Sequence, residues 1–467
     1  MKHFRLLFYA MFALAVLSCC STPKVETSVP HSVVNGKIVL ETPRRAPGQQ
    51  SALLLTCEPM ETVRVGFVGL GMRGYSALNR FSFIEGVKMT ALCDIETERV
   101  NKAQEKLHSL GLDDAETYDG EDGWKRLCES DNVDLVYLCT PWQNHVEMAV
   151  YAMEHGKHVA VEVPAAMNIA QCWQLVDTCE KTRKHCMMLE NCCYDFFEMT
   201  ILNMAQHGLF GDVIYAEGAY IHNLDPYWHS YHGNWRLSFN QEHRGDVYPT
   251  HGLGPICQVM NIHRGDKFNY LVSMDTDSYH GADVAEEMMG TRDFANGDHT
   301  VTLIRTAKGK MIQIQHNVYT RRPYDRKYQI EGVEGYACKY PTGKIAIMEK
   351  NISDDNPSYD DLDGEQFVDD ATYKALMEKF KSPIASEIED LARKVGGHGG
   401  MDFIMDYRLI YCLRHGLPLD QDVYDAAEWS CMTELSGLSI LYGSMPVEVP
   451  DFTRGEWEKV DGFHYYR

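Results

Sequence analysis

The segment HRGDVYPTHGLGP, residues 243–255, places a phenol and an imidazole three positions apart. A tyrosine can donate or accept a proton beside a positive charge, and a histidine titrates near neutral pH, so Tyr248 and His251 can do acid–base chemistry. Pro249 and the glycines after His251 fix the backbone around the pair. A single histidine is more often a helix cap or a core residue. The pair therefore becomes a candidate catalytic group only if other features bring a cofactor and a substrate to it.

A glycine-rich turn supplies a cofactor site. Gly69-x-Gly71-x-x-Gly74 directly follows an apolar strand and opens a helix. The glycines allow a tight turn, a close approach of a pyrophosphate and close packing of helix on strand, while the helix N-terminus offers free N–H groups. Asp94 ends the next strand, twenty residues after Gly74. A carboxylate there can accept both ribose hydroxyls and would repel a 2′-phosphate, so the pattern favours NAD over NADP.

The elements around this turn alternate between short apolar runs and amphipathic stretches. The expected strands are Val63–Val68, Val87–Cys93, Val133–Cys139, His158–Val161 and Cys186–Leu189. Glu147–Glu154 and Ile169–Thr182 have the spacing of amphipathic helices. This alternation predicts a parallel, doubly wound sheet, which is the Rossmann arrangement.

The residue pattern of the sequence changes after about residue 210. DVIYAEGAYIH, HTVTLIRTA, KMIQIQHNVY and KYQIEGVEGY are longer alternating strands, with a hairpin-like turn at Lys308-Gly309-Lys310. We therefore predict an α/β fold: an NAD-binding Rossmann domain at 61–190, then an α+β substrate-binding and catalytic domain at 191–467 with an open, largely antiparallel sheet. GGHGG, residues 396–400, interrupts the C-terminal helical region as a loop, and its histidine can line a pocket.

Composition limits the partners of the protein. The chain has 467 residues, enough for two domains, and is 45% hydrophobic and 24% charged, as a globular protein is. Its net charge of −23 disfavours nucleic acid and anionic membrane surfaces as partners.

The N-terminus predicts export. Two basic residues precede the apolar run Leu6–Leu17, which indicates a signal peptide at 1–18. The string VLSC resembles a bacterial lipobox, which implies cleavage before Cys19 and a lipid on its sulfur; a plain secretion signal is the alternative. Residues 19–60 are rich in Pro, Ser, Thr and charge, and predict a tether or an arm laid on the body. We therefore expect a protein anchored by lipid to the bacterial cell envelope, with no other membrane contact.

The cysteines and the remaining histidines predict neither disulfides nor a metal. Beyond Cys19 and Cys20, thirteen cysteines remain, without metal-type spacing, and we expect small buried side chains rather than an extensive disulfide framework. His229, His232 and His243 invite a metal interpretation, but they lack a repeated ligand set with a defined third ligand. We expect no metal, and a polar, aromatic-rich loop near a sugar.

The segment CTPWQNHVEMAVYAMEHGKHVAVEVP, residues 139–164, resembles a family pattern. The pattern is Thr-Pro…His…Gly-Lys-His-Val…Glu-Lys-Pro of the glucose–fructose oxidoreductase / inositol dehydrogenase superfamily, and the resemblance extends from about residue 63 to the C-terminal region. It implies NAD as cofactor. The contacts that the resemblance and the glycine turn imply for NAD are Gly69, Gly71, Met72, Arg73, Gly74, Asp94, Trp142, Gln143, Asn144, His145, Glu162, Val163, Asn191 and Tyr248.

The chain departs from that pattern at one position. The dehydrogenases use the lysine of Glu-Lys-Pro to assist removal of a substrate proton, whereas Val163 has no acid–base chemistry. Valine there, with TPWQNH and YPTHGLGP, resembles glycoside hydrolase family 109, the NAD-dependent α-N-acetylgalactosaminidases. This resemblance implies a cycle of C3 oxidation, C2 deprotonation, elimination of the aglycone, hydration and C3 reduction. The outcome is hydrolysis with retention and no net redox change.

The same resemblance implies the roles of individual residues. Tyr248 and His251 would be the acid–base residues, and the sequence leaves open which of them removes the C2 proton. The implied substrate contacts are Tyr194, Tyr220, Arg236, Tyr248, Pro249, Thr250, His251 and Tyr324. The substrate would be a glycan with terminal α-linked N-acetylgalactosamine, and the superfamily's open sheet often pairs across a two-fold axis, which points to a homo-oligomer.

Two other functions stay open. One is an NAD-dependent sugar dehydrogenase that releases a keto-sugar and NADH, which Val163 disfavours. The other is a non-catalytic, lipid-anchored sugar-binding protein. The Tyr248–His251 pair beside an intact glycine turn disfavours that second alternative.

Overall fold

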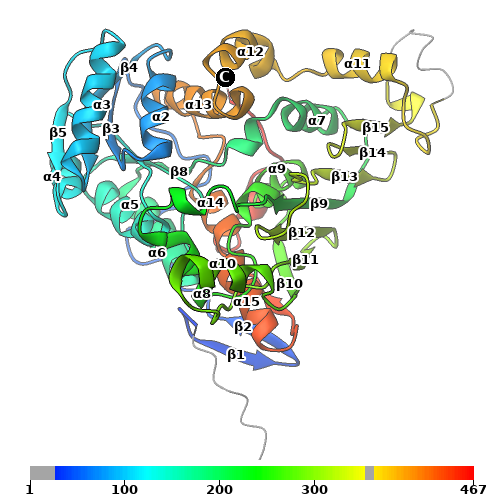
Figure 1. Cartoon of the computed structure of the whole chain (residues 1–467). Helices are drawn as coiled ribbons and strands as arrows, with labels where there is room; N and C mark the ends of the chain where they lie inside the picture. Colours follow the sequence, from blue (N-terminus) through cyan, green and yellow to red (C-terminus); the bar gives the residue numbers. More distant parts are fainter. Residues whose placement is uncertain (1–26, 353–361, 467) are drawn as a thin grey trace, which may run out of the picture.

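The computed structural model describes residues 27–352 and 362–466 and contains two β-sheets (Figure 1). The six-stranded sheet lies in the blue and cyan part of the chain, and most of the ten-stranded sheet lies in the green and yellow part. The predicted signal peptide and Cys19 fall outside the described residues. Within the described ranges, no helix combines the length and the apolar character that a membrane span needs.

The six-stranded sheet is parallel, with the strand order β5-β4-β3-β6-β7-β8. Its strands are β3 Val63–Val68, β4 Val87–Asp94, β5 Glu116–Asp119, β6 Leu135–Leu138, β7 His158–Val161 and β8 Cys186–Met188. Its helices are α2 Met72–Phe81, α3 Thr97–Ser109, α4 Gly123–Glu129, α5 His145–Glu154 and α6 Ile169–Thr182. Every residue of β6 and β7 is buried, as in a sheet covered on both faces. The predicted Rossmann sheet is confirmed, with the glycine turn between β3 and α2.

The ten-stranded sheet is mixed and largely antiparallel, with the order β1-β2-β16-β10-β11-β12-β9-β13-β14-β15. Its strands are β1 His31–Val34, β2 Lys37–Leu40, β9 Val213–Ile221, β10 Phe268–Asp275, β11 Thr300–Thr306, β12 Met311–Asn317, β13 Gln329–Gly332, β14 Gly335–Cys338, β15 Lys344–Ile347 and β16 Val447–Glu448. The predicted hairpin turn joins β11 to β12: the N–H of Thr306 donates to the carbonyl of Lys310 at 2.9 Å, and Gly309 has φ +85°. The predicted open sheet is therefore confirmed.

Helices from the second half of the chain also cover the Rossmann sheet. The helices after β8 are α7 Phe196–Gln206, α8 Trp235–Glu242, α9 Thr250–Met260, α10 His280–Met289, α11 Asp370–Lys379, α12 Pro383–Val395, α13 Met401–His415, α14 Val423–Ser430 and α15 Met432–Leu441. α13 packs against α2 and β3, and α14 packs against α6. Arg80 of α2 and Asp406 of α13 form a buried ion pair at 2.6 Å, and the hydroxyl of Tyr137 donates to the same carboxylate at 2.8 Å. The C-terminal helices thus complete the N-terminal domain.

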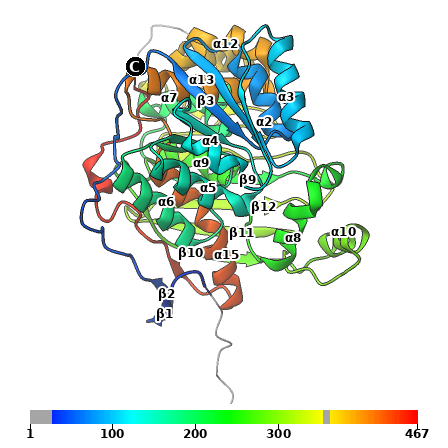
Figure 2. The ribbon, with the colours of Figure 1, turned by 90° about the vertical axis from the view of Figure 1, so that its left-hand side faces the viewer.

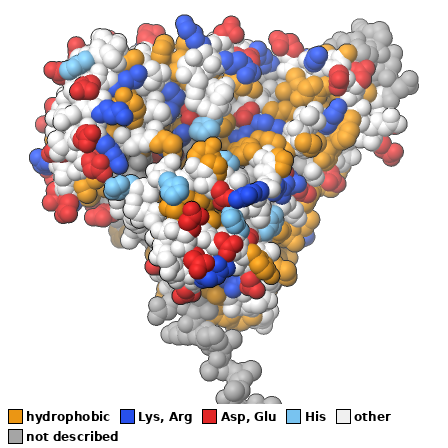
Figure 3. Space-filling view, in the orientation of Figure 1, with side chains coloured by type: hydrophobic (Ala, Val, Ile, Leu, Met, Phe, Trp, Pro, Cys, Tyr) orange, Lys and Arg blue, Asp and Glu red, His pale blue; other side chains and the backbone are white. Residues whose placement is uncertain are grey.

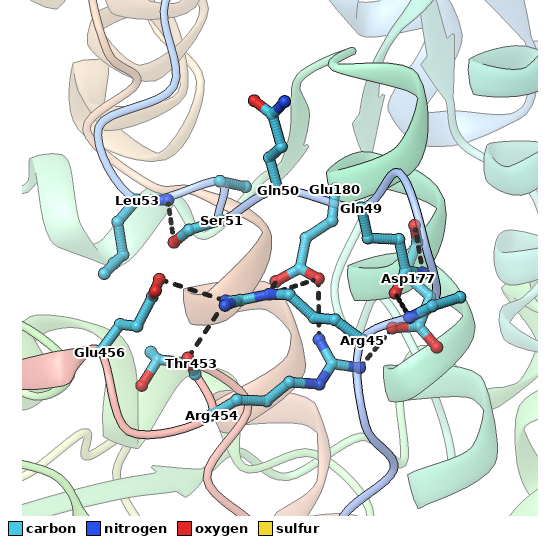
Figure 4. Close-up of polar contacts among 12 residues, drawn as sticks. Arg45, Gln49, Gln50, Ser51, Leu53, Asp177, Glu180, Thr453, Arg454 and Glu456 are labelled. Carbon is cyan, nitrogen blue, oxygen red and sulfur yellow. Dashed lines mark hydrogen bonds and ion pairs between the residues drawn. The ribbon is translucent and has the colours of Figure 1, made fainter.

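Residues 27–60, within the segment predicted as a tether or arm, lie against the body (Figure 2). Their first part forms the hairpin β1–β2, which extends the ten-stranded sheet through β16. Their second part crosses α6 and the C-terminal segment, where buried Glu180 accepts from Nε of Arg45 at 3.0 Å and from Nη1 of Arg454 at 2.8 Å (Figure 4). We call this cluster the arm clasp; it comprises Arg45, Asp177, Glu180, Arg454 and Glu456. The hairpin is not predicted by the sequence, because strands of four residues carry a weak pattern.

The thirteen cysteines among the described residues are free thiols, and most of them are buried. They pack in the core as small apolar side chains.

Candidate active site

The glycine turn between β3 and α2 has the shape that a dinucleotide needs. Gly69 has φ +88°, and a Cβ there would lie 2.6 Å from the carbonyl oxygen of Cys139. A Cβ on Gly74 would lie 1.9 Å from the carbonyl oxygen of Gly69, so turn and helix can meet only without a side chain. Gly71 is the N-cap of α2 and makes no side-chain cap. The first N–H groups of α2 are therefore available to a phosphate, which the helix dipole favours.

Asp94 ends β4 beside the glycine turn and is almost fully buried. One carboxylate oxygen accepts the N–H of Leu70 at 2.7 Å, and the other accepts the N–H of Glu96 at 3.0 Å. These bonds fix the carboxylate at the edge of the turn. A phosphate cradle and a ribose-binding carboxylate thus lie in adjoining loops, and the residues present fit NAD.

The TPWQNH segment lies next to the EVP segment. Trp142 is buried, and its indole N–H donates to the carbonyl oxygen of Val163 at 3.1 Å. Gln143 is exposed and Asn144 is half-buried. The hydrogen bond joins the two segments that the resemblance places around the nicotinamide.

His145 differs from its expected place in the nicotinamide pocket. It is fully buried, and its ring nitrogens lie 2.8 Å from the carbonyl oxygens of Pro164 and Thr140. Burial lowers the pKa of His145, against the effect of these two carbonyls. The imidazole therefore ties two loops together from behind the pocket rather than lining it.

Arg73 is the centre of a charged network on the cofactor side of the site. Its Nε lies 2.7 Å from Oε1 of Glu162, and its Nη1 lies 3.0 Å from Oδ2 of Asp402. The amide of Asn191 donates to the other oxygen of Asp402 at 2.5 Å. Burial raises the pKa of Asp402, but Arg73 and the other neighbouring cations hold it well below its usual range. The network joins α2, the end of β7, the segment after β8 and α13.

The GGHGG loop between α12 and α13 brings His398 to this network. The loop glycines Gly396, Gly397, Gly399 and Gly400 all have positive φ. Nδ1 of His398 lies 2.9 Å from Asp402, and the side chain is 58% exposed. His398 also contributes, after burial, Arg236 and His251, to lowering the pKa of His222 to about 4. The loop therefore presents an exposed imidazole between the cofactor network and the aromatic side of the site.

Arg236 is buried among aromatic rings on the second side of the site. Its guanidinium carbon lies 4.7 Å from the ring centroid of Tyr248, 5.0 Å from that of Trp142 and 6.0 Å from that of Tyr220. Its Nη1 donates to the hydroxyl of Tyr231 at 2.8 Å. Nε and Nη2 are buried without a hydrogen-bond partner. Two unpaired donors of a fixed fork beside aromatic faces suit the hydroxyl or amide oxygens of a sugar.

Helix α9 begins at Thr250 and carries His251 in its first turn. A Cβ on Gly252 would lie 2.8 Å from the backbone nitrogen of Ala219, so this glycine lets α9 lie directly on β9. A Cβ on Gly254 would lie 2.7 Å from Cγ of Glu190. The glycines of YPTHGLGP thus allow α9 to approach both the sheet and Glu190.

Tyr248 and His251 are in contact, and Glu190 completes the group. The Tyr248 hydroxyl lies 3.5 Å from Nε2 of His251, and the two rings meet edge to face at 5.0 Å. Nδ1 of His251 lies 2.7 and 2.8 Å from the two carboxylate oxygens of Glu190, which is fully buried. Burial, followed by the neighbouring Tyr220, raises the pKa of Tyr248 well above its usual range, so the phenol keeps its proton. Carboxylate, imidazole and phenol thus form a line.

The other predicted substrate contacts fall into two groups: Tyr220 and Tyr324 belong to a cluster of aromatic rings, and Pro249 and Thr250 stand at the start of α9. Tyr220 lies 4.7 Å from the ring of Tyr248 and 5.2 Å from that of His251. Tyr324 is 40% exposed and lies 5.1 Å from the ring of His222, which in turn contacts Tyr220. Pro249 is the N-cap of α9, and Thr250 is buried behind it.

Tyr194 differs from its expected place beside the sugar. Its side chain is fully buried in the core, and its hydroxyl lies 3.3 Å from Oδ2 of Asp420, to which it donates. The same carboxylate pairs with Arg408 at 2.7 Å. Tyr194 therefore packs in a separate polar cluster, and the structure does not bring it together with the Tyr248–His251 pair.

Basic side chains and histidines lie together on one face of the molecule. Figure 3 shows Lys, Arg and His side chains in the middle of this face, between the two domains. This concentration occurs although the chain carries a net charge of −23. It suits a ligand with phosphate groups.

Sequence reasoning did not identify Glu190 and Asp402 as members of the site. Glu190 stands directly before Asn191 in LEN, and a charged residue at the end of a fully apolar strand was its local signal. Asp402 follows the GGHGG loop but has no signal of its own. It meets Arg73 across 329 positions of the chain, which no local pattern can show.

Two sequence families match the two parts of the chain. Residues 63–190 match the oxidoreductase family with an NAD-binding Rossmann fold, and residues 194–459 match the C-terminal domain of glycosyl hydrolase 109. Among solved structures, myo-inositol dehydrogenase from Lactobacillus casei in complex with NAD(H) and myo-inositol has a TM-score of 0.57 at 15% identity, covering 84% of this chain and 99% of that one. An oxidoreductase domain protein from Kribbella flavida has a TM-score of 0.61 at 18% identity, covering 84% and 100%. Fold and glycine turn thus define an NAD-binding protein of the glucose–fructose oxidoreductase / inositol dehydrogenase superfamily.

Full-length relatives identify the branch of this superfamily. The glycosyl hydrolase family 109 protein 1 of Bacteroides thetaiotaomicron is 54% identical over 465 residues, 99% of both chains. The glycosyl hydrolase family 109 protein of Porphyromonas gingivalis is 56% identical over 432 residues, 92% of both chains. The chain belongs to glycosyl hydrolase family 109, and it is a glycosidase of that family with NAD as its cofactor.

Proposed function

We propose that this glycosidase hydrolyses terminal α-linked N-acetylgalactosamine from glycans, with retention and without net oxidation or reduction. The observation that carries the proposal is a carboxylate–imidazole–phenol line of Glu190, His251 and Tyr248 beside an NAD cradle in which Val163 replaces the usual lysine. The site therefore has proton chemistry outside the position at which sugar dehydrogenases keep theirs.

The cofactor would be held by the glycine turn, Asp94 and the Arg73–Glu162–Asp402 network. NAD, when bound, supplies a transient oxidation of the sugar at C3, which acidifies the proton at C2, and it returns the same electrons at the end of the cycle.

The residues of the aromatic side hold the sugar and move its protons. The two unpaired donors of Arg236 would bind oxygens of the sugar. His251 would take the proton from C2, and the phenol of Tyr248 would donate a hydrogen bond to the sugar or its leaving oxygen. The exposed imidazole of His398 lies on a glycine loop at the border of the two sides and is the second imidazole able to exchange protons with the substrate.

The N-terminal pattern supports an external place of action for this enzyme. We propose export with cleavage before Cys19 and attachment to the cell envelope by lipid, which would present the site to glycans outside the cytoplasm. Metabolic labelling with a clickable fatty acid tests this step, and a Cys19→Ala variant that still carries the label would contradict it.

The catalytic proposal is tested with p-nitrophenyl α-N-acetylgalactosaminide in deuterated water, without added nucleotide. We expect release of nitrophenol, deuterium at C2 of the free sugar, the α-anomer as first product and no accumulating NADH. Release of nitrophenol without deuterium at C2 would reject the elimination cycle. If the glycoside releases no nitrophenol, and a second assay with free sugars and added NAD⁺ forms NADH, the chain is a dehydrogenase.

A further inference from the structure

Hydrogen bonds fix both the side chain and the backbone of Glu190. Its carboxylate is fully buried, and one oxygen also accepts the N–H of Cys192 at 3.0 Å. Its backbone is held by Gln421, whose amide nitrogen donates to the Glu190 carbonyl at 2.8 Å and whose amide oxygen accepts the Glu190 N–H at 3.3 Å. Gly254 leaves the space for its side chain. The carboxylate therefore has one position, and it points at His251.

The contact with Glu190 determines which nitrogen of His251 carries a proton. A carboxylate only accepts hydrogen bonds. Burial raises the pKa of Glu190, but His251 and the hydrogen bonds from Cys192 and Thr250 together bring it below its usual value, so Glu190 is ionised. Nδ1 of His251, at 2.7 Å from Glu190, must then be the N–H donor. Nε2 keeps its lone pair and faces the Tyr248 hydroxyl at 3.5 Å.

The position of His251 in the fold makes a negative partner necessary. His251 is the second residue of α9, where the positive end of the helix dipole disfavours an imidazolium. Arg236 lies 4.7 Å from the ring of Tyr248, which contacts His251, and adds a positive charge on that side. The other titratable neighbours, Tyr220, Tyr248 and the thiol of Cys192, are neutral because burial raises the pKa of each. Among the described groups packed around the ring, Glu190 is the anion in direct contact with it.

We propose that Glu190 is the positioning residue that makes Nε2 of His251 the proton acceptor of the site. The proposal rests on the proposed function: the C2 proton moves to Nε2, and the C–H electron pair stays on the sugar and forms the C1–C2 double bond as the bond from C1 to the aglycone oxygen breaks. The imidazolium so formed is paired with Glu190 until the proton is returned. Tyr248 then acts as a donor, which resolves the choice that the sequence left open.

The test compares Glu190→Gln, Glu190→Asp and the control Glu198→Gln on the holoenzyme. Glu198 is an equally buried carboxylate that pairs with Arg326 and Lys339 instead of an imidazole. Glu190→Gln should lower kcat about 10- to 100-fold at unchanged KM, and it should move the acidic limb of the kcat/KM profile to lower pH, because the imidazolium loses the anion that it contacts. Glu190→Asp keeps the charge, so its limb should stay in place. Glu198→Gln should affect thermal stability and leave the limb where it is.

A second readout does not depend on turnover. The ¹⁵N chemical shifts of His251, assigned by difference from His251→Ala, should show the Nδ1–H tautomer in the wild type and a mixture of tautomers in Glu190→Gln. An unmoved acidic limb in Glu190→Gln, or an Nε2–H tautomer in the wild type, would overturn the proposal. A wild type with this tautomer and no activity on any α-N-acetylgalactosaminide would instead reject the proposed function and leave the positioning role standing.

Discussion

The arm clasp holds two half-buried arginines and the aromatic side of the active site holds a buried one, and their hydrogen-bonding groups are satisfied differently. In the clasp, Glu180 accepts from Arg45, Arg454 and the hydroxyl of Tyr424, and Arg454 also pairs with Asp177. Figure 4 shows the contacts of the two arginines with Glu180 and Asp177, which come together from the arm, α6 and the C-terminal segment. In the active site, Nε and Nη2 of Arg236 are buried without partners. The charged groups of the clasp are therefore paired with one another, whereas two hydrogen-bond donors of the site have no partner.

Paired polar groups, as in the clasp, stabilise the fold, whereas unpaired polar groups, as in the site, are available to bind a ligand. A buried charge without a partner is costly, and native proteins keep such groups mainly where they serve function. His316 repeats the pattern behind Arg236, since both of its ring nitrogens are buried without partners and burial lowers its pKa to about 3. We therefore expect substitutions in the clasp to change stability and substitutions in the site to change turnover.

The largest expected effect is loss of turnover in His251→Ala. Removal of the general base should lower kcat about 10²–10⁴-fold, while the midpoint of thermal unfolding moves by only a few degrees. Initial rates and differential scanning calorimetry on the same sample measure the two quantities. His243→Ala is the matched control, because that ring stacks on Phe239 and bonds to its own helix. Retained activity in His251→Ala would remove this residue from the mechanism.

Glu180→Ala should have the opposite profile. It leaves Arg45 and Arg454 without their shared anion, and we expect a loss of about 3–5 kcal/mol in the free energy of unfolding. The kcat of the folded fraction should change less than about twofold. Urea unfolding measures the first quantity, and active-site-normalised rates measure the second. Asp177→Ala, at the partly exposed end of the clasp, should cost far less. A Glu180→Ala protein as stable as the wild type would contradict the role of the clasp.

Asp246→Asn should stabilise the protein above neutral pH. Burial raises the pKa of Asp246 to about 7, and its carboxylate accepts the N–H of Tyr248 at 3.0 Å. The folded state therefore binds this proton more tightly than the unfolded chain, so stability falls as pH rises from about 4 to about 7 and then levels off. The asparagine variant lacks this fall.

Urea unfolding at pH 4 and pH 8 measures the effect of Asp246→Asn. We expect a gain on the order of 2–4 kcal/mol at pH 8 and a small difference at pH 4. Asp298→Asn is the control, because its carboxylate accepts the N–H groups of Tyr279, His280 and Gly281 and should gain nothing at either pH. Equal gains at both pH values would show that the titration of Asp246 is not the cause.

Asp94→Ala should have the smallest of these effects, a roughly tenfold weaker retention of NAD. The variant loses the carboxylate and also frees the N–H of Leu70, so the glycine turn loses its fixed edge. Nucleotide per protein after dialysis, read by absorbance and by calorimetric titration, measures the change. Glu96→Ala, whose carboxylate is exposed two positions away, should retain NAD like the wild type. Unchanged nucleotide content in Asp94→Ala would show that the ribose contact is misassigned.

Much of the cofactor side could be predicted because its signals are local. The turn at Gly69, Gly71 and Gly74 and the carboxylate of Asp94 come from one β-turn-α-β unit of fixed geometry. The strands β3 and β7 and the helix α6 begin and end at the predicted residues. The period of the hydrophobic residues and the residue types at the turns determine such features within a few positions of the chain.

The sequence by itself thus determined the Rossmann unit, the open sheet and the spacing of Tyr248 and His251, because each depends on neighbours within about one element. Only the tertiary structure decided which side chains meet. Glu190 reaches His251 across 61 positions and Asp402 reaches Arg73 across 329. The first contact exists because α9 packs against the turn Asn191–Tyr194 that follows Glu190, and the second because α13 packs onto the Rossmann domain. Burial decided the rest: it placed Tyr194 and His145 in the interior and left two donors of Arg236 without a hydrogen-bond partner.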